Sequence, residues 1–99
     1  MKKDRSFIQS LEKGLAVIRT FSQQSPEQTI AEVAAKAHIS RAAARRVLLT
    51  LEQLDYVSQG ARGEFSLRPS ILSLSFSYLS ALEFPELARP YMQRIVTEL

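Results

Sequence analysis

The feature that most constrains the fold is the stretch from Ser40 to Leu54, in which apolar residues recur at helical spacing. At about 100° per residue, one side of such a helix collects apolar side chains and the other collects charged or small ones. The apolar side comprises Ala44, Val47, Leu48, Leu51 and Leu54, and the opposite side comprises Arg41, Ala42, Arg45, Leu49 and Glu52. The Ser40 hydroxyl suits an N-cap, because it accepts a bond from an otherwise unpaired backbone N–H. The sequence therefore predicts an amphipathic helix that begins after Ser40.

The outward face of this helix is basic in its first two turns, which hold three arginines, three alanines and no acidic residue. Such a face suits a DNA major groove, which admits a helix, offers guanine O6 and N7 to arginine, and offers thymine methyl groups to alanine. A charged face that only contacts solvent is the alternative interpretation, and for an isolated basic helix it is the better one. The neighbouring segments decide between the two.

Composition and charge fit one small domain with a basic portion. Residues 1–68 hold eleven Lys and Arg against seven Asp and Glu, a net charge of +4, whereas residues 69–99 hold two against three, a net charge of −1. A polyanion-binding surface would therefore belong to the first two thirds of the 99-residue chain. The chain has no cysteine for a disulfide or thiolate metal site, no signal-peptide pattern, and no apolar run near the roughly 18 residues of a membrane span. We expect a soluble cytoplasmic protein.

Two shorter segments precede the basic helix. Ser6–Ser22 predicts a helix with a stripe of apolar residues at positions Ile8, Leu11, Leu15, Ile18 and Phe21, flanked by Ala16 and Val17. The polar run Ser22–Gln28 predicts a turn. Thr29 and Glu32 then match a capping box, in which each side chain bonds to the backbone N–H of the other residue. A second, short helix is predicted to run from there to about Ala37.

This short helix, a turn of about three residues and the basic helix follow one another as in a helix-turn-helix motif. His38 lies where the chain must reverse, and histidine tolerates a positive φ better than most residues. It is the only histidine and has no Cys, Asp or Glu at ligand spacing. We therefore interpret His38 as a turn residue rather than a metal ligand or a general base.

A hairpin is predicted after the basic helix, which Asp55 can end. Tyr56–Gln59 and Glu64–Leu67 have the composition of two strands, and a glycine-containing turn, Gly60–Gly63, joins them. The turn would place Arg62 at the tip of a wing, within reach of a phosphate or a minor groove. A solvated hairpin tip is the alternative interpretation.

The last third of the chain predicts helices. Pro69–Leu82 alternates apolar residues with serine as a strand does, yet its length, its helical apolar stripe and Pro69 at a first helical position favour a helix. Phe84 and Pro85 would break it. A further amphipathic pattern then begins, with apolar residues at Leu87, Tyr91, Ile95 and Leu99.

Several segments in the right order resemble the N-terminal DNA-binding region of IclR-type transcriptional regulators. The segments that carry the resemblance are Ser10–Ile18, Glu32–Ala34, Ile39–Arg41, Arg46–Leu51 and Tyr56–Val57. Within that family, the run from Ser40 to Leu51 most resembles regulators of protocatechuate and 4-hydroxybenzoate breakdown. His38 and Asp55 stand where the family commonly has glycine, and Arg68 replaces a frequent glycine after the wing.

The resemblance implies a mainly α fold with a small β-hairpin. A winged helix-turn-helix domain would occupy residues 1–68, a linker helix residues 69–84, and the start of an effector-binding C-terminal domain residues 85–99. The implied partners are palindromic double-stranded DNA, a second copy of the chain in a homodimer or higher even oligomer, and a small aromatic acid bound by the C-terminal domain. No cofactor or metal is implied.

The residues predicted to contact DNA are Ser40, Arg41, Ala42, Ala43, Arg45, Arg46 and Arg62. Of these, Arg41, Ala42, Arg45 and Arg46 would enter the major groove, and Arg62 would meet the neighbouring backbone or minor groove. An enzyme is disfavoured, because the sequence has no nucleophile, histidine and acid set, no glycine-rich phosphate loop and no metal cluster. A winged-helix protein-interaction module is the alternative function, since a fold alone does not fix function. Salt-sensitive binding to duplex DNA would distinguish the two.

Overall fold

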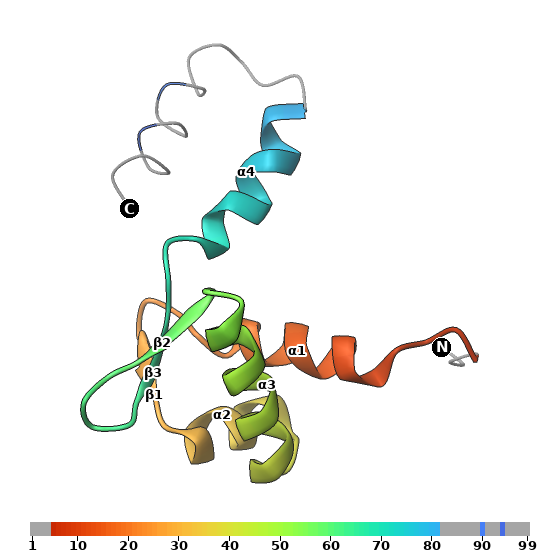
Figure 1. Cartoon of the computed structure of the whole chain (residues 1–99), viewed down its shortest axis with the longest axis vertical. Helices are drawn as coiled ribbons and strands as arrows, with labels where there is room; N and C mark the ends of the chain where they lie inside the picture. Colours follow the sequence, from red (N-terminus) through yellow and green to blue (C-terminus); the bar gives the residue numbers. More distant parts are fainter. Residues whose placement is uncertain (1–4, 82–89, 91–93, 95–99) are drawn as a thin grey trace. The chain divides into compact units, whose positions relative to one another are not determined.

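The structure is a computed structural model that describes residues 5–81, 90 and 94. It divides into two compact units, residues 1–67 and 68–99, which are described separately. The first unit holds three helices and a three-stranded antiparallel sheet (Figure 1). Its elements are α1 (Gln9–Arg19), β1 (Glu27–Gln28), α2 (Ile30–Ala37), α3 (Arg41–Gln53), β2 (Val57–Gln59) and β3 (Phe65–Leu67). This arrangement confirms the predicted winged helix-turn-helix fold.

A single apolar core lies between the helices and the sheet of this unit. Leu48 of α3 and Phe65 of β3 are among its largest fully buried side chains. The core residues come from every helix and from both hairpin strands: Val17, Val33, Ala34, Ala44, Leu48, Leu51, Val57 and Phe65. Because burial of apolar surface is the main favourable contribution to folding, this cluster fixes how α3 and the hairpin are held.

The first helix differs from its prediction in length and in the face that it buries. It begins at Gln9, and its N-cap residue Ile8 makes no side-chain cap hydrogen bond. Val17 is its buried residue, and Ile18 and Phe21 of the predicted stripe pack against the core in a half-buried position. The other stripe residues, Ile8, Leu11 and Leu15, are 60%, 58% and 46% exposed. The N-terminal part of α1 projects beyond α2 and α3 (Figure 1). Apolar periodicity locates an apolar face, but it does not say whether the core or another surface covers that face.

The capping box at the start of α2 is confirmed. The Glu32 N–H donates to Thr29 Oγ1 at 3.2 Å, and the Thr29 N–H donates to Glu32 Oε1 at 2.9 Å. The backbone hydrogen bond from Thr29 lowers the pKa of Glu32, and hydrogen bonding with the Thr29 side chain and the charge of Lys36 act in the same direction. The folded state therefore favours the ionised carboxylate.

Because the pKa of Glu32 is lowered on folding, ionised Glu32 stabilises the fold above its ordinary pKa, and this contribution is lost as pH falls through the folded-state value. Glu32→Gln keeps an acceptor but removes the titrating group. We expect the wild type to be more stable than this variant at neutral pH, and the difference to vanish in acid. Urea unfolding of both proteins at pH values from neutral to strongly acidic measures it. A difference that does not change with pH would contradict the prediction.

Residues 27 and 28 correct the prediction of a plain polar turn over Ser22–Gln28. Glu27 and Gln28 form β1, which pairs with β3 through Glu27 opposite Ser66 and Gln28 opposite Phe65. The sheet order is β1-β3-β2, so β3 is the central strand. Gln28 is fully buried, and its Nε2 donates to Thr20 Oγ1 at 3.0 Å. A strand of two polar residues has no periodicity that the sequence would show.

In the second unit, α4 spans Ile71–Ala81, which confirms the prediction of a helix over a strand. Ser73, Ser77 and Ser80 fit a helix because their hydroxyls bond to carbonyls of the preceding turn. The three bonds run from Ser73 Oγ to Ser70 O at 2.6 Å, from Ser77 Oγ to Ser73 O at 2.9 Å, and from Ser80 Oγ to Ser77 O at 3.1 Å. Pro69 precedes the helix and does not occupy its first position.

The predicted break at Phe84 and Pro85 and the apolar pattern after it lie outside the described residues. Within the part that the structure describes, no helix is long and apolar enough to cross a membrane.

Candidate nucleic-acid interface

The turn between α2 and α3 sets the direction of the recognition helix. His38 ends α2 in the left-handed conformation with φ 59°, as predicted for a residue at the chain reversal. The Ile39 N–H then donates to Ala34 O at 3.1 Å. Ser40 caps α3, because its Oγ accepts from the Ala43 N–H at 3.0 Å. The start of α3 is thus fixed by hydrogen bonds on both sides of the turn.

The side of α3 that faces away from the core carries the predicted DNA-binding residues. Ala44, Leu48 and Leu51 are its buried residues, and the first turn has no acidic residue. Ala43 is half-buried. The other predicted DNA-binding residues at this end of the helix are exposed, namely Ser40, Arg41, Ala42, Arg45 and Arg46. The helix therefore presents cations and small side chains together, as the sequence predicted. Their contacts with DNA remain predictions.

The end of α3 corrects one position of the predicted apolar side. Leu54 is the C-cap residue and is 59% exposed, so it does not belong to the core. Asp55 follows in the left-handed conformation with φ 69°, and the Tyr56 N–H donates to Leu51 O at 2.8 Å. This reversal at Asp55 turns the chain from α3 into β2, which leaves Leu54 on the outside.

The wing is the hairpin of β2 and β3. The Gly60 N–H donates to Glu64 O at 2.8 Å, and the Gly63 N–H donates to Gly60 O at 3.0 Å, which closes the turn. Gly63 has φ 85°, a conformation that favours glycine. Arg62 is exposed at this turn. The wing and α1 lie on opposite sides of α3 (Figure 1).

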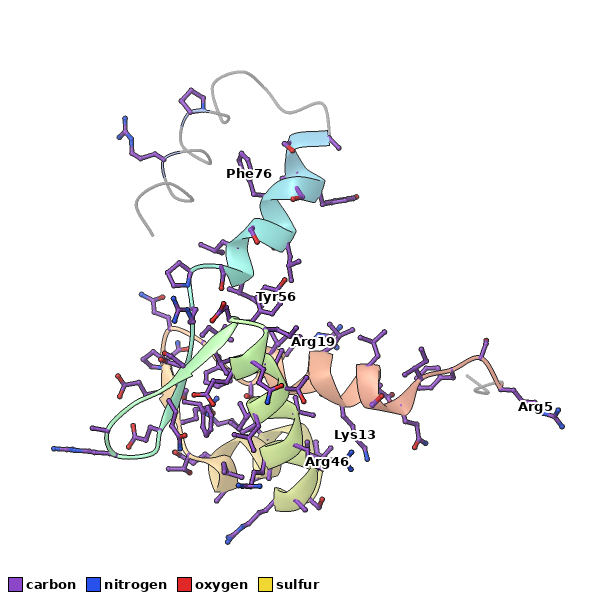
Figure 2. All side chains as sticks on the ribbon, viewed as in Figure 1. Arg5, Lys13, Arg19, Arg46, Tyr56 and Phe76 are labelled. Atoms are coloured by element: carbon purple, nitrogen blue, oxygen red, sulfur yellow. The ribbon has the colours of Figure 1, made fainter. Side chains whose placement is uncertain are left out.

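The three arginines of α3 do not share one environment. Arg46 lines a groove between α1 and α3 together with Lys13 of α1, whereas Arg41 and Arg45 do not line it. Figure 2 shows Lys13 and Arg46 at the same edge of the unit. Lys13 is a candidate functional residue that the sequence did not single out. Lys13 precedes the buried residue Val17 by four positions, so the two share one face of α1, and this spacing could have indicated Lys13.

The electrostatic character of the interface is cationic. Within residues 5–81, 90 and 94, no group of three or more His, Cys, Asp and Glu side chains is placed to hold a metal ion. The site consists of a capped helix with exposed arginines and a flanking hairpin with an arginine at its turn. In this geometry the helix can enter the major groove, and the neighbouring hairpin can contact the phosphate backbone.

Comparison with known proteins identifies the family. Residues 10–61 match the IclR helix-turn-helix domain. The chain is 41% identical to the Pca regulon regulatory protein of Pseudomonas putida, and the match covers 97% of this chain and 33% of that protein. It is 34% identical to the Pca operon regulatory protein of Acinetobacter baylyi, over 97% of this chain and 34% of that protein.

The fold comparison agrees. The crystal structure of an IclR family transcriptional regulator from Brucella abortus superposes with a TM-score of 0.82 at 32% identity, over 91% of this chain and 35% of that one. The chain spans about a third of the length of the curated relatives that it matches. Its relatives are regulators of transcription and not enzymes. The chain belongs to the IclR family of transcriptional regulators, as a helix-turn-helix DNA-binding domain.

Proposed function

We propose that this chain binds double-stranded DNA with sequence specificity, placing α3 in the major groove and the wing at the adjacent backbone or minor groove. The observation that carries the proposal is the exposure of Arg41, Arg45 and Arg46 on a capped helix with no acid in its first turn. Arginine forms bidentate bonds with guanine in the major groove, and Ala42 leaves room for the helix to approach. The remaining predicted contacts, Ser40 and Ala43, lie at the same end of α3.

We further propose that the intact protein acts in the cytoplasm and controls genes of aromatic-acid catabolism in response to a small aromatic acid. Two relatives that align with nearly the whole chain carry the name of Pca regulators, which supports this assignment. In this proposal a C-terminal effector domain binds the aromatic acid, and α4 connects the two domains. In this proposal the helix-turn-helix unit binds DNA and takes no part in binding the aromatic acid.

Selection from a random duplex library with the chain as bait tests specific binding. We expect enrichment of a palindromic sequence, and an affinity for it that exceeds the affinity for a scrambled duplex and falls steeply with salt. Fluorescence anisotropy of the selected and scrambled duplexes measures both quantities. Failure to enrich any sequence, or binding that ignores salt, would contradict the proposal and favour a protein-interaction module.

We also propose that two copies, or a higher even number, bind the palindrome, since a two-fold protein matches a two-fold site. Exposed apolar side chains support an interface in two places. On α1 they are Ile8, Leu11 and Leu15, and on α4 they are Leu74 and Tyr78, which are spaced four residues apart on one face.

Replacing Leu15 by serine tests this interface. The side chain is 46% exposed and would be covered in a dimer, so its loss from both copies should cost about 1–3 kcal/mol and weaken palindrome binding about tenfold or more. Sedimentation velocity with the selected palindrome measures the number of chains per duplex. Leu54→Ser is the matched control, because Leu54 is 59% exposed but lies on neither apolar stripe. One chain per palindrome for the wild type would contradict dimer binding.

A further inference from the structure

A groove of about 590 Å³ runs between α1 and α3. Its α1 side includes Ser10, Lys13 and Gly14, and its α3 side includes Ala43, Arg46 and Thr50. Lys13 and Arg46 approach it from the two different helices (Figure 2). The groove therefore has one cation on each wall, brought together by the packing of α1 on α3.

The lining of the groove is suited to an anion. None of the described residues that line it is acidic. Arg46 is exposed and Lys13 is half-buried, so a ligand can reach the Arg46 guanidinium and the Lys13 ammonium group. The Thr50 hydroxyl already donates to Arg46 O at 2.8 Å, which leaves the two cations, the Ser10 hydroxyl and the Gln9 amide as side-chain donors. Two cations that line one groove attract phosphate oxygens, because charge-assisted hydrogen bonds are stronger than neutral ones.

Small residues keep the groove open between these cations. Gly14 has no side chain, and a Cβ placed on it would meet no heavy atom within 4 Å. Ala43, opposite on α3, contributes only a methyl group to the lining. An extended chain of phosphates can therefore approach Lys13 and Arg46 without meeting a bulky side chain at these two positions.

The groove also lies in the right place relative to the recognition helix. It follows the flank of α3 that faces α1, and the wing lies on the opposite flank (Figure 1). A helix in the major groove has one phosphate backbone on each side, because the two strands wall the groove. If Arg62 of the wing meets one backbone, the other backbone runs along the α1 flank.

We propose that Lys13 and Arg46 form a phosphate clamp, which binds the sugar–phosphate backbone of the DNA strand on the α1 flank of α3. The inference rests on the proposed function, since it requires α3 to enter the major groove. It assigns Arg46 to positioning the protein on the duplex and leaves Arg41 and Arg45 for the base edges. Lys13 becomes a DNA-binding residue outside the helix-turn-helix segments.

Binding to the selected palindrome and to a scrambled duplex over a salt series tests the clamp. We expect Lys13→Ala and Arg46→Ala each to lower the slope of log affinity against log salt by about 1 for each clamp occupied. Each variant should also lower the affinity for the palindrome and for the scrambled duplex by the same factor. Arg19→Ala is the matched control, because it removes a charge from an exposed position of the same helix away from the groove (Figure 2). Its slope should equal that of the wild type.

A second measurement locates the phosphate. Neutral methylphosphonate groups placed one at a time along the palindrome should weaken wild-type binding at one or two positions that flank each half-site. The variant that carries both Lys13→Ala and Arg46→Ala should lose this sensitivity at those positions alone. Circular dichroism checks that the variants keep the helicity of the wild type.

Each outcome separates the clamp from the proposed function. If the wild type prefers its selected duplex but neither Lys13→Ala nor Arg46→Ala changes the salt slope, the clamp is wrong and the function stands. A changed specificity ratio for Arg46→Ala would overturn the clamp in favour of base contact by Arg46. A wild-type chain that binds no duplex overturns both proposals.

Discussion

Replacing Leu48 by alanine is expected to destabilise the DNA-binding unit by about 2–5 kcal/mol. Leu48 is fully buried in the core cluster that joins α3 to the other helices and the hairpin. The substitution removes apolar contacts and leaves a cavity, and both effects act against the folded state. A domain of this size has a small margin of stability, so a large share of the molecules should lose α3 and with it DNA binding.

Leu54→Ala is the matched control, because it makes the same chemical change in the same segment. Leu54 is the C-cap residue of α3 and is 59% exposed, so we expect a loss below about 1 kcal/mol. Urea unfolding followed by far-UV circular dichroism gives both free energies. Equal losses for the two leucines would contradict the placement of Leu48 in the core and Leu54 outside it.

The contrast between these leucines shows what an apolar pattern can and cannot predict. Helical projection places Leu54 on the same side as Leu48, and it is correct for Ala44, Leu48 and Leu51, which are the buried residues of α3. The projection fails at Leu54 because Asp55 takes a left-handed conformation and turns the chain toward β2. Where a helix stops matters as much as its period.

Features set by neighbouring residues were predicted well from the sequence. The capping box of Thr29 and Glu32, the Ser40 cap and the left-handed turn at His38 each depend on groups within a few residues of one another. Their hydrogen bonds join residues that are close in the sequence, so the sequence alone indicates the partners. For the same reason the bounds of α2 and the start of α3 agree with the predicted ones.

Features set by distant residues were not predicted. Strand β1 exists because Gln28 pairs with Phe65 of a strand far along the chain, and nothing in the polar run around Gln28 indicates that pairing. The buried face of α1 depends in the same way on how that helix meets α2 and α3. The pairing of Lys13 with Arg46 across one groove follows from this packing, so the sequence indicated the arginine and not its neighbour.

The remaining prediction separates the roles of the exposed arginines. Arg45 is exposed on α3 and does not line the α1–α3 groove. If it contacts a base edge, Arg45→Ala should cost about 1–3 kcal/mol on the selected palindrome and much less on scrambled DNA, so that sequence preference falls. If Arg62 at the wing turn neutralises a phosphate, Arg62→Ala should lower the affinity for both duplexes by the same factor. It should also lower the slope of log affinity against log salt by about 1 per site contacted.

Arg46→Ala is the control for Arg45→Ala, because the two positions are adjacent on one helix and lose the same charge. Anisotropy on both duplexes over a salt series compares the three variants directly. An unchanged specificity ratio for Arg45→Ala would mean that α3 enters the groove with another face than the one that carries Arg45. Each variant must keep the helicity of the wild type, because a partly unfolded domain would also lose affinity for both duplexes and would imitate the loss of a phosphate contact.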